Sequence, residues 1–576
     1  MVSYADRPWT KNYDPGVPAS LDYPKIPLYE LLEEAARKSP NTPACVMSAK
    51  LPLFGRKHKA VTYKELDELT DKLAAALASM GLQKGDRVAL VSPNATQFVI
   101  AFFGILKAGG IVVALNPTFP PAKWQEQLSD SGARVVITMS LFYNGLNSIR
   151  DKTPVEKIIV FNYKDFLPPL AATLFTLVRE KKEGHYVESL KPGDVWLNDI
   201  FAQYRADQRP RISIDPRTDT AIFQYTGGTT GVPKAARGPH FALVANALQM
   251  KAWMMAGNHG EPVSFIAAIP LFHVYGMVAV MTFAISEAAP MYMVPNARDI
   301  TDVLEVIDTF KPSFFMAVPA LYNAINQHPD VLAGKYDLSS IRGCISGSAP
   351  LAPETKRRFE ELTGGVVMEG FGMSEAPTAT HCNPFRGKNK AGSIGMPFPD
   401  VECRIVSLDD EVSDVPVGEV GELVLRGPVM MTGYHNMPTE TANALRDGWL
   451  YTGDIARMDE DGYFYIVDRK KDMVLIGGFN VYPNIVEKVL MDHPAVLECG
   501  VAGIPHPEKE GQEALKAWVV LKEGEQITAE ELIEFCSERL APYEVPRRIA
   551  FVPQIPRTAV GKILRRELVR MEMEGS

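Results

Sequence analysis

The sequence predicts an α/β protein with a large N-terminal part, made of two α/β sheet subdomains and a β-rich subdomain, followed by a small mobile α+β domain. Three observations lead to this prediction. Short apolar runs alternate with helical segments before Glu402, which is typical of mainly parallel sheets covered by helices. Between Glu402 and Tyr465, short alternating strands are separated by Gly, Pro and Asp turns. Beyond Lys471, a compact mixture of helices and strands follows.

Helices of the N-terminal part are expected where apolar residues recur at a spacing of three or four. Leu28 to Lys38 has this pattern, Tyr63 opens a longer Ala- and Leu-rich helix that ends near Gly81, and Phe98 to Lys107 forms a third. Strands are expected where apolar residues follow one another between turn signals. These runs are residues 87–91, 111–115, 135–137, 157–160, 221–223 and 264–268.

In the C-terminal part, helices are expected at residues 484–491 and 529–540, and strands at residues 498–503 and 514–521. The charged run from Asp468 to Asp472 comes just before them. Clusters of Lys and Asp are ordinarily solvated turns. We place the domain boundary in this run, which gives an N-terminal domain of residues 1–470 and a C-terminal domain of residues 471–576.

One apolar segment has two interpretations. Residues 166–178 are mainly Leu, Ala, Phe, Thr and Pro, and Arg179, Lys181 and Lys182 follow them. Such a segment is either a helix buried in the core or an apolar surface patch that touches lipid headgroups. Peripheral contact with the inner face of the cell membrane is therefore left open.

Composition and charge exclude several classes of protein. The chain has 576 residues, 46% of them hydrophobic, so at least two domains with substantial cores are expected. A formal net charge of −9 offers no basic field, and nucleic acid is not expected as a partner. The polar first residues lack the apolar core of a secretory signal. The longest apolar runs, residues 98–106 and 277–285, are shorter than the roughly 20 residues that cross a bilayer, so we expect a cytoplasmic protein.

The six cysteines are scattered along the chain, without a C-x-x-C pair or an adjacent histidine cluster. They are Cys45, Cys344, Cys382, Cys403, Cys499 and Cys536. We expect reduced and mostly buried thiols, and no zinc or iron–sulfur site.

The decapeptide from Tyr225 to Lys234 contains three glycines, three threonines and a lysine. Glycines let a backbone approach an anion closely, hydroxyl and N–H groups donate hydrogen bonds to it, and the ammonium adds a positive charge. The loop therefore predicts a polyphosphate site, with ATP as the expected ligand. The alternative is a flexible loop between a strand at residues 222–225 and a helix beyond Pro239. A Walker A loop is excluded, because Pro233 precedes the lysine and Ala235 follows it.

Six further motifs follow in order along the chain. They are Pro270 to Gly276, Ser346 to Leu351, Glu369 to Glu375, Tyr451 to Asp454, Asp468 to Asp472 and Pro556 to Lys562. Together with the loop, they resemble the motifs of the adenylate-forming superfamily, which includes acyl-CoA synthetases, aryl-CoA ligases, luciferases and the adenylation domains of peptide synthetases. The resemblance covers the chain from about Tyr29, and within the superfamily the sequence looks most like bacterial long-chain fatty acid–CoA ligases.

This resemblance implies an ATP-dependent ligase that works in two steps. The fatty acid and ATP form an acyl-adenylate and pyrophosphate, and the acyl group then passes to CoA with release of AMP. The first step brings an anionic carboxylate to a triphosphate, so it requires cations and oriented donors. ATP, Mg²⁺ and CoA are the implied cofactor and co-substrates.

The ATP site that the resemblance implies combines the phosphate loop with residues of the later motifs. Its members are Thr226, Gly227, Gly228, Thr229, Thr230, Gly231, Lys234, Gly347, Ser348, Ala349, Pro350, Glu369, Gly370, Phe371, Gly372, Met373, Ser374, Asp454, Arg469 and Lys562. In this set Phe371, where tyrosine is more frequent, would stack on adenine. Asp454 would accept hydrogen bonds from the ribose hydroxyls, with Arg469 nearby.

By the same resemblance, the catalytic residues are Lys562, Glu375, Thr226, His273 and Arg469. Lys562 would bridge the substrate carboxylate and the α-phosphate, and Glu375 would bind Mg²⁺ with help from Thr226. Each residue also has a plainer interpretation. A carboxylate such as Glu375 is common at a helix start, and a lone histidine in an apolar stretch is more often packed in a core. We assign His273 to the site without the role of a general base.

The acyl pocket and the hinge complete the implied machinery. The pocket residues are His273, Val318, Gly347 and Gly372, and the residues toward CoA are Gly477, Gly478 and Phe479. Small or apolar side chains suit a fatty chain. The C-terminal domain would rotate about Lys471 between the two steps, so that one pocket serves two reactions.

Several alternatives stay open. The substrate could be a medium-chain or an aryl acid, and the acceptor could be the phosphopantetheine of a carrier protein instead of CoA. A non-catalytic binder of nucleotide or acyl groups is disfavoured by the joint presence of Lys234, Glu375, Asp454, Arg469 and Lys562. A homodimer is also left open. The sequence departs from the family at residues 235–240, directly after Lys234, where relatives more often have a glycine after the lysine. This departure affects the expected geometry of the acyl-pocket wall more than the expected binding of ATP.

Overall fold

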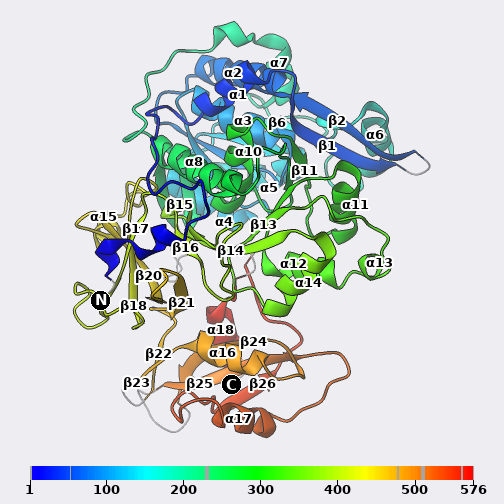
Figure 1. Ribbon diagram of the computed structural model, residues 1–576. Helices are drawn as coiled ribbons and strands as arrows, with labels where there is room; N and C mark the ends of the chain where they lie inside the picture. The colour runs from blue at the N-terminus through cyan, green and yellow to red at the C-terminus, as the bar shows by residue number, and fades with distance from the viewer. Residues whose placement is uncertain are drawn as a thin grey trace.

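The computed structural model describes residues 3–51, 54–226, 233–476, 479–506, 513–558 and 562–574. Figure 1 shows a large N-terminal body and a smaller C-terminal body, drawn in orange and red, that lies against one end of it. The mixed α/β architecture with a small C-terminal domain is therefore confirmed.

The first sheet has seven strands in the order β7-β6-β5-β3-β4-β8-β9. Their bounds are β3 (Arg87–Val91), β4 (Ile111–Leu115), β5 (Val135–Met139), β6 (Lys157–Phe161), β7 (Val195–Trp196), β8 (Thr220–Thr226) and β9 (Lys234–Pro239). All neighbours run parallel except β8 and β9, which are antiparallel. The sequence did not indicate β9, because its alanines, glycine and proline have little preference for strands.

The second sheet has nine strands in the order β16-β15-β14-β13-β12-β10-β11-β1-β2. Their bounds are β1 (Pro43–Leu51), β2 (Gly55–Thr62), β10 (Phe265–Ala267), β11 (Met291–Met293), β12 (Phe314–Ala317), β13 (Gly343–Ser346), β14 (Val366–Met373), β15 (Ala376–Cys382) and β16 (Met396–Pro397). Neighbouring strands run parallel from β14 through β13, β12, β10 and β11 to β1. Antiparallel strands lie at both edges, with β15 and β16 beyond β14 and β2 beyond β1. In such a sheet, ligands bind at the carboxyl ends of the parallel strands.

Two helices pack between these sheets. Helix α3 (Thr96–Lys107) is buried along its whole length and contacts β3 and β4 of the first sheet and β1 of the second. Helix α8 (His240–Ala256) contacts β8 and β9 on one side and β15 on the other. A helix that is apolar on every side is suited to such a position, which accounts for the apolar run at residues 98–106.

The other helices of the N-terminal part cover the outer faces of the sheets or lie between strands. They are α1 (Glu30–Lys38), α2 (Tyr63–Ser79), α4 (Pro121–Ser131), α5 (Ser140–Ile149), α6 (Pro169–Leu174), α7 (Leu197–Gln203), α9 (Val274–Gly276), α10 (Phe283–Ser286), α11 (Ile300–Phe310), α12 (Pro319–Asn326), α13 (Pro329–Leu332), α14 (Pro353–Thr363), α15 (Pro438–Ala444) and the π-helices η5 (Phe175–Arg179) and η7 (Met277–Thr282). Within the described ranges, no helix has both the length and the apolar character needed to span a membrane.

The β-rich subdomain is a five-stranded sheet formed by β17 (Glu402–Val406), β18 (Gly421–Arg426), β19 (Leu445–Arg446), β20 (Trp449–Met458) and β21 (Phe464–Arg469). The N-terminal segment of the chain packs on it, since the buried Trp9 meets Phe464 edge-on with 5.9 Å between the ring centres. This contact braces β21, the strand that leads into the C-terminal domain.

The C-terminal part has its own sheet and its own apolar core. Its elements are β22 (Val474–Ile476), β23 (Phe479–Val481), α16 (Pro483–Met491), β24 (Val496–Pro505), β25 (Glu513–Leu521), α17 (Ala529–Ser537), β26 (Arg548–Phe551) and α18 (Arg565–Glu574). Val486, Val501 and Leu515 are among the buried residues of that core. The four elements expected here are confirmed, and β22, β23, β26 and α18 are additions.

Two other predictions have a clear outcome. All six cysteines are buried and free, as expected. Residues 169–178 form α6 and part of η5, in which Ala171 and Phe175 are buried, whereas Leu177 is 75% exposed and Val178 is 65% exposed. The segment is thus partly buried and partly on the surface, and its contact with lipid stays a prediction.

Candidate active site

The two ends of the glycine-rich loop lie opposite each other. The register of β8 and β9 pairs Thr226 with Lys234. The ammonium of Lys234 lies 5.4 Å from the centre of the Tyr434 ring, over its face. The loop residues Gly227, Gly228, Thr229, Thr230 and Gly231 lie outside the described residues.

Glu375 lies next to this lysine-bearing strand. It stands in the turn between β14 and β15, not at a helix start, so a favourable helix dipole does not explain it. Its carboxylate oxygen Oε1 accepts a hydrogen bond of 2.8 Å from the Tyr434 hydroxyl, and its backbone oxygen accepts one from the Met431 N–H. Tyr434 thus connects the two ionic residues that were assigned to the phosphates and the metal ion.

Asp454 and Arg469 form a second ionic group. They are directly opposite each other on β20 and β21, and Arg469 Nε lies 2.5 Å from Asp454 Oδ1. Asp454 is only 1% exposed, and its other oxygen, Oδ2, has no hydrogen-bond partner among the described residues. Burial raises the pKa of Asp454, although Arg469 acts in the opposite direction. An acceptor that is buried and unpartnered is costly unless a ligand donates to it, and a ribose hydroxyl is such a donor.

Lys562, from the C-terminal domain, reaches these groups. Its charge interacts with those of Arg469, Asp454 and Glu375, and the residue itself stays exposed. Desolvation by the protein groups around its ammonium is the main reason why the pKa of Lys562 falls to about 8, and the positive charge of Arg469 adds to the effect. The structure therefore brings the last motif of the chain to the same place as the middle motifs.

His273 is near enough to Lys562 to be affected by its charge. Burial lowers the pKa of His273 to about 4, and the charge of Lys562 contributes to this shift. The imidazole is therefore neutral at pH 7. Its Nδ1 accepts the Tyr275 N–H at 3.2 Å, at the start of α9, which leaves Nε2 as the protonated nitrogen.

The carboxyl ends of β12 and β13 form one wall of the site. Val318 follows β12, and Gly347, Ser348, Ala349 and Pro350 follow β13. A Cβ on Gly347 would lie 3.3 Å from the Tyr275 ring, and the Tyr275 hydroxyl donates to the Ile345 oxygen at 2.7 Å. Ser348 has a φ of +75°, a left-handed conformation that is rare for serine and is often found at functional sites.

The end of β14, the strand beside β13, continues this wall. Phe371 is half-buried and meets His381 edge-on at 5.9 Å. Gly372 must be glycine, because a Cβ there would lie 1.7 Å from the Thr378 oxygen. Gly370, Met373 and Ser374 are also half-buried. Glu369 is the exception, since its buried carboxylate accepts the Gly392 N–H at 2.7 Å and thereby holds a neighbouring loop.

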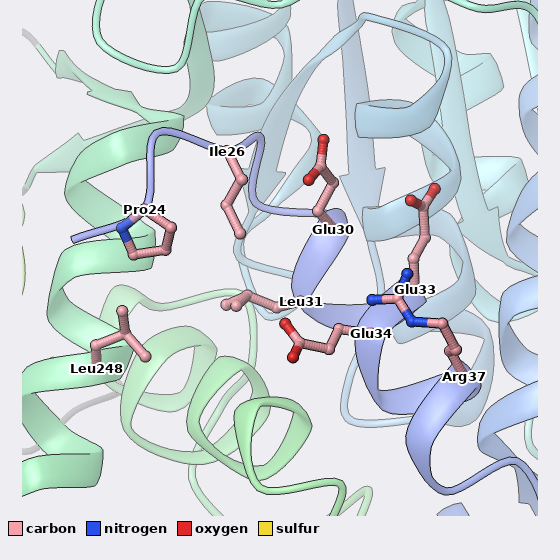
Figure 2. Close-up of a pocket in the computed structure, with 8 residues that line it drawn as sticks. All are labelled: Pro24, Ile26, Glu30, Leu31, Glu33, Glu34, Arg37 and Leu248. Carbon is pink, nitrogen blue, oxygen red and sulfur yellow. The ribbon is translucent and has the colours of Figure 1, made fainter. Parts of the chain in front are cut away.

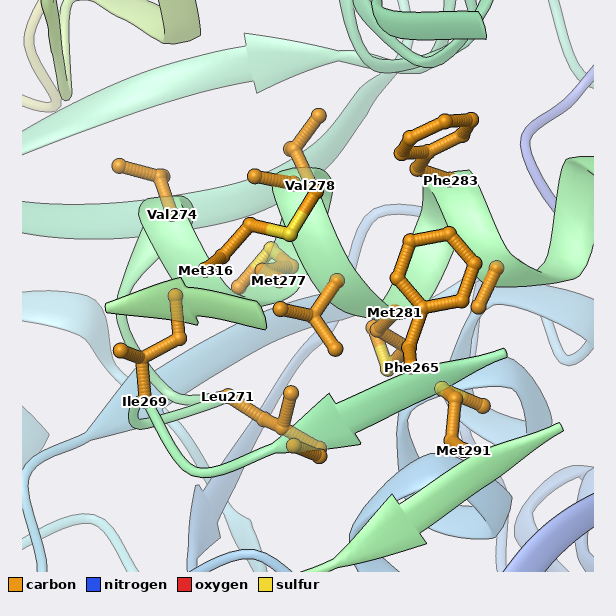
Figure 3. Packing of buried hydrophobic residues seen from close by; sticks show 14 of the residues in the cluster. Phe265, Ile269, Leu271, Val274, Met277, Val278, Met281, Phe283, Met291 and Met316 are labelled. Atoms are coloured by element: carbon orange, nitrogen blue, oxygen red, sulfur yellow. The ribbon is translucent and has the colours of Figure 1, made fainter. Parts of the chain in front are cut away.

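Helix η7, which follows His273 and α9 along the chain, packs in a methionine-rich apolar core. Figure 3 shows Met277, Val278 and Met281 of η7 facing Phe265 of β10 and Met316 of β12. All five side chains are fully buried. Methionine is unbranched and adapts its shape readily, so it can fill the irregular space between η7 and the strands β10 and β12.

A separate pocket lies between α1, the segment before it and α8 (Figure 2). It is lined by Pro24, Ile26, Glu30, Leu31, Glu33, Glu34, Arg37 and Leu248. Three glutamates and one arginine give it a negative character, which opposes phosphate and carboxylate ligands. It is not a candidate for the nucleotide or the acid.

Two family models match the chain. The model described as AMP-binding enzyme matches residues 32–435, and the model described as AMP-binding enzyme C-terminal domain matches residues 485–562. The chain belongs to the AMP-binding enzyme family. The first match ends at residue 435 and the second begins at residue 485, so the segment between them carries the Asp454–Arg469 pair.

Individual members of this family resemble the chain over nearly its full length. It is 40% identical to a long-chain-fatty-acid–CoA ligase of Bacillus subtilis (strain 168), over 99% of both chains. A protein of the same name from Yersinia pestis is 38% identical over 98% of both chains. Among solved structures, the anthranilate CoA ligase AuaEII in complex with anthranoyl-AMP has a TM-score of 0.79 and 27% identity, with 99% of each chain covered.

Not every predicted residue of this AMP-binding enzyme lies at the cleft. Phe479 is on β23, is 55% exposed and stacks on Tyr543 with 4.5 Å between the ring centres. Figure 1 shows the β22–β23 hairpin at the outer edge of the small domain. Gly477 and Gly478 lie outside the described residues. In this orientation the small domain presents Lys562, and not Phe479, to the site.

Sequence reasoning missed Tyr434 and gave Tyr275 no role of its own. Tyr275 belongs to a motif that was found, but its hydrogen bond to the end of β13 depends on the fold. Tyr434 follows a Gly in a turn-like stretch, and nothing local indicates that its ring faces Lys234. Backbone contacts between β9 and residues 432–435, among them the antiparallel bridge between Ala236 and Tyr434, place it there.

Proposed function

We propose that this chain is an ATP-dependent, AMP-forming ligase that joins long-chain fatty acids to CoA. The observation that carries the proposal is the position of Lys562 beside Asp454, Arg469 and Glu375, in a chain that is similar from end to end to two proteins named long-chain-fatty-acid–CoA ligase. The names of those relatives specify long-chain fatty acids, and we propose the same substrate class for this chain.

In the first step, an oxygen of the fatty acid carboxylate attacks the α-phosphorus of ATP, and the bond to pyrophosphate breaks. Both reactants are anions, so their approach is opposed by charge repulsion. The ammonium of Lys562 would lie between the carboxylate and the α-phosphate and offset this repulsion. Lys234 and the loop that starts at Thr226 would hold the departing phosphates, and Asp454 Oδ2 would accept from the ribose.

A magnesium ion is part of the same proposal. Glu375 and Thr226 offer oxygen ligands, which is the donor type that Mg²⁺ prefers, and a single carboxylate suits an ion whose other ligands are phosphates and water. When bound, the ion would neutralise phosphate charge. His273, neutral at pH 7, would border the acyl carboxylate without adding a charge.

In the second step, the sulfur of CoA attacks the acyl carbonyl carbon, and AMP leaves. We propose that residues 471–576 move as a unit about Lys471 for this step. Lys562 would leave the cleft, and the segment of Gly477, Gly478 and Phe479 would replace it at the CoA channel. The 55% exposure of Phe479 at the outer edge of the small domain supports this proposal, because the part of its ring that Tyr543 does not cover stays accessible to solvent.

The test is ATP–pyrophosphate exchange followed by CoA-dependent AMP release, over acids from acetate through octanoate and oleate to 4-coumarate. Exchange and thioester formation that peak with oleate are expected. A peak with coumarate would indicate an aryl-CoA ligase, and a peak with octanoate a medium-chain enzyme. Exchange without CoA turnover would indicate a carrier-protein acceptor, and no exchange at all would contradict the proposal.

We also propose that the segment formed by α6 and η5 contacts the inner face of the cell membrane. Leu170, Leu177 and Val178 are exposed there, and the exposed Arg179 stands next to them. Apolar tips next to basic side chains suit an anionic lipid surface. Co-sedimentation with anionic vesicles should decrease in the L177D variant, and equal binding would contradict the contact.

The sequence also left a homodimer open. Sedimentation velocity, which separates monomer from dimer, tests this possibility.

A further inference from the structure

Tyr434 stands between the two ionic residues at the phosphate end of the site. Its ring face lies 5.4 Å from the Lys234 ammonium, and its hydroxyl donates to Glu375 Oε1 at 2.8 Å. The residue is only 9% exposed. The side chain therefore contacts both groups at once and has little freedom to turn away.

The backbone around Tyr434 is tied to both of these partners. We name residues 431–435 the linking segment. Its His435 N–H donates to the Ala235 oxygen at 2.8 Å, next to Lys234. At its other end, the Met431 N–H donates to the Glu375 oxygen at 2.8 Å. The linking segment thus fixes the distance between β9 and the turn after β14, and Tyr434 projects from it into the gap.

The two contacts of Tyr434 have different chemical effects. An aromatic ring attracts an ammonium through its face without accepting its hydrogens. All three N–H groups of Lys234 therefore stay available for phosphate oxygens. The hydroxyl occupies one oxygen of Glu375 and stops the carboxylate from rotating, because a hydrogen bond to a charged acceptor is strong and directional.

We propose that Tyr434 is a positioning residue for the phosphate end of the ATP site: its ring places Lys234 and its hydroxyl orients Glu375. The inference rests on the proposed function and deepens it. Tyr434 touches neither the reacting carboxylate nor the α-phosphate in this role. It acts only through the two residues that would meet the outer phosphates and the magnesium ion.

Two substitutions separate the two contacts. Y434F removes the hydroxyl and keeps the ring, and Y434L removes the ring as well. The binding of ATP is measured by calorimetry with and without Mg²⁺, so that the readout does not depend on turnover. In Y434F, affinity for Mg²⁺–ATP should fall about fivefold to tenfold, while affinity for metal-free ATP stays within about twofold. In Y434L, the affinities for Mg²⁺–ATP and for metal-free ATP should both fall, because no aromatic ring holds the Lys234 ammonium in position.

Tyr465 offers a matched control. Its hydroxyl donates to Asp459 Oδ2 at 3.0 Å and Arg457 lies over its ring at 4.3 Å, so it has the same two kinds of contact away from the phosphate end. Y465F should leave both ATP affinities and the dependence of exchange on Mg²⁺ concentration unchanged.

The proposal is overturned if Y434F keeps wild-type affinity for Mg²⁺–ATP, or if it loses affinity equally with and without the ion. In activity assays, Y434F should need more Mg²⁺ for half-maximal exchange and show a raised KM for ATP, with an unchanged KM for the acid. If wild-type protein binds Mg²⁺–ATP but activates no fatty acid, the proposed function fails, and the calorimetry still decides the role of Tyr434.

Discussion

The lowered pKa of Lys562 predicts how the first half-reaction depends on pH. In the proposed function, Lys562 supports adenylation only while it carries a positive charge. With a pKa of about 8, roughly nine-tenths of the free enzyme is protonated at pH 7 and about one-tenth at pH 9. The kcat/KM of ATP–pyrophosphate exchange, which reports ionisations of the free enzyme, should therefore fall about tenfold between these values.

The K562R variant is the informative comparison. An arginine keeps its charge beyond pH 9 because its pKa lies above 12. Exchange by K562R should start lower, since a guanidinium differs in shape and hydrogen bonding from an ammonium, but it should stay flat across the range in which the wild type declines. K562A should lose exchange and keep most of the transfer from a synthetic acyl-adenylate to CoA.

This pH profile is measured by fixed-time assays of labelled pyrophosphate exchange at pH 6.5 to 9.5. The Mg²⁺ concentration is saturating and the ionic strength is constant. A flat wild-type profile, or a decline that K562R shares, would refute the assignment of the titrating group. Loss of both half-reactions in K562A would refute the restriction of Lys562 to the first step.

The remaining predictions concern the walls, the ribose acceptor and the hinge. G372A should lower the free energy of unfolding by about 3 kcal/mol or more, because a Cβ would overlap the Thr378 oxygen; chemical denaturation measures it, and an unchanged midpoint would contradict the close packing. D454A should weaken ATP binding about tenfold to hundredfold, because a hydrogen bond to a charged group is worth about 1.5–3 kcal/mol and Arg469 loses its partner; unchanged affinity by calorimetry would exclude it as an acceptor. K471P should spare exchange and slow thioester formation, and equal overall turnover would contradict the hinge.

Much of the fold could be predicted from the sequence, because its main elements have clear local signals. Residues 87–91 and 111–115 are apolar runs between turns, and they are strands β3 and β4 with the same bounds. Strand β9 has no such signal. It forms because β8 offers it an antiparallel partner and the linking segment pairs with its other side. That is a tertiary effect, which outweighs local preference.

The site shows the same division. The types of residue at Asp454 and Arg469 could be chosen from motifs, but their contact follows from the register of β20 and β21. Tyr434 could not be found, since its partners lie far away in the sequence and only the fold brings them together. Phe479 could be named but not placed, because its position depends on how the small domain is oriented.

The orientation of the small domain is stabilised by a contact next to the proposed hinge, Lys471. Asp468, the residue before Arg469 on β21, is fully buried, and its Oδ2 accepts the Asn484 N–H at 2.8 Å at the start of α16. A carboxylate at a helix start is favoured by the helix dipole, so this contact stabilises the small domain in the position that presents Lys562. A rotation about Lys471 must break it. Strand β21 therefore carries Arg469 to the proposed ATP site and, through Asp468, also holds the small domain in place. In the proposed mechanism, the geometry of the first step is thereby linked to the free-energy cost of the domain rotation that follows it.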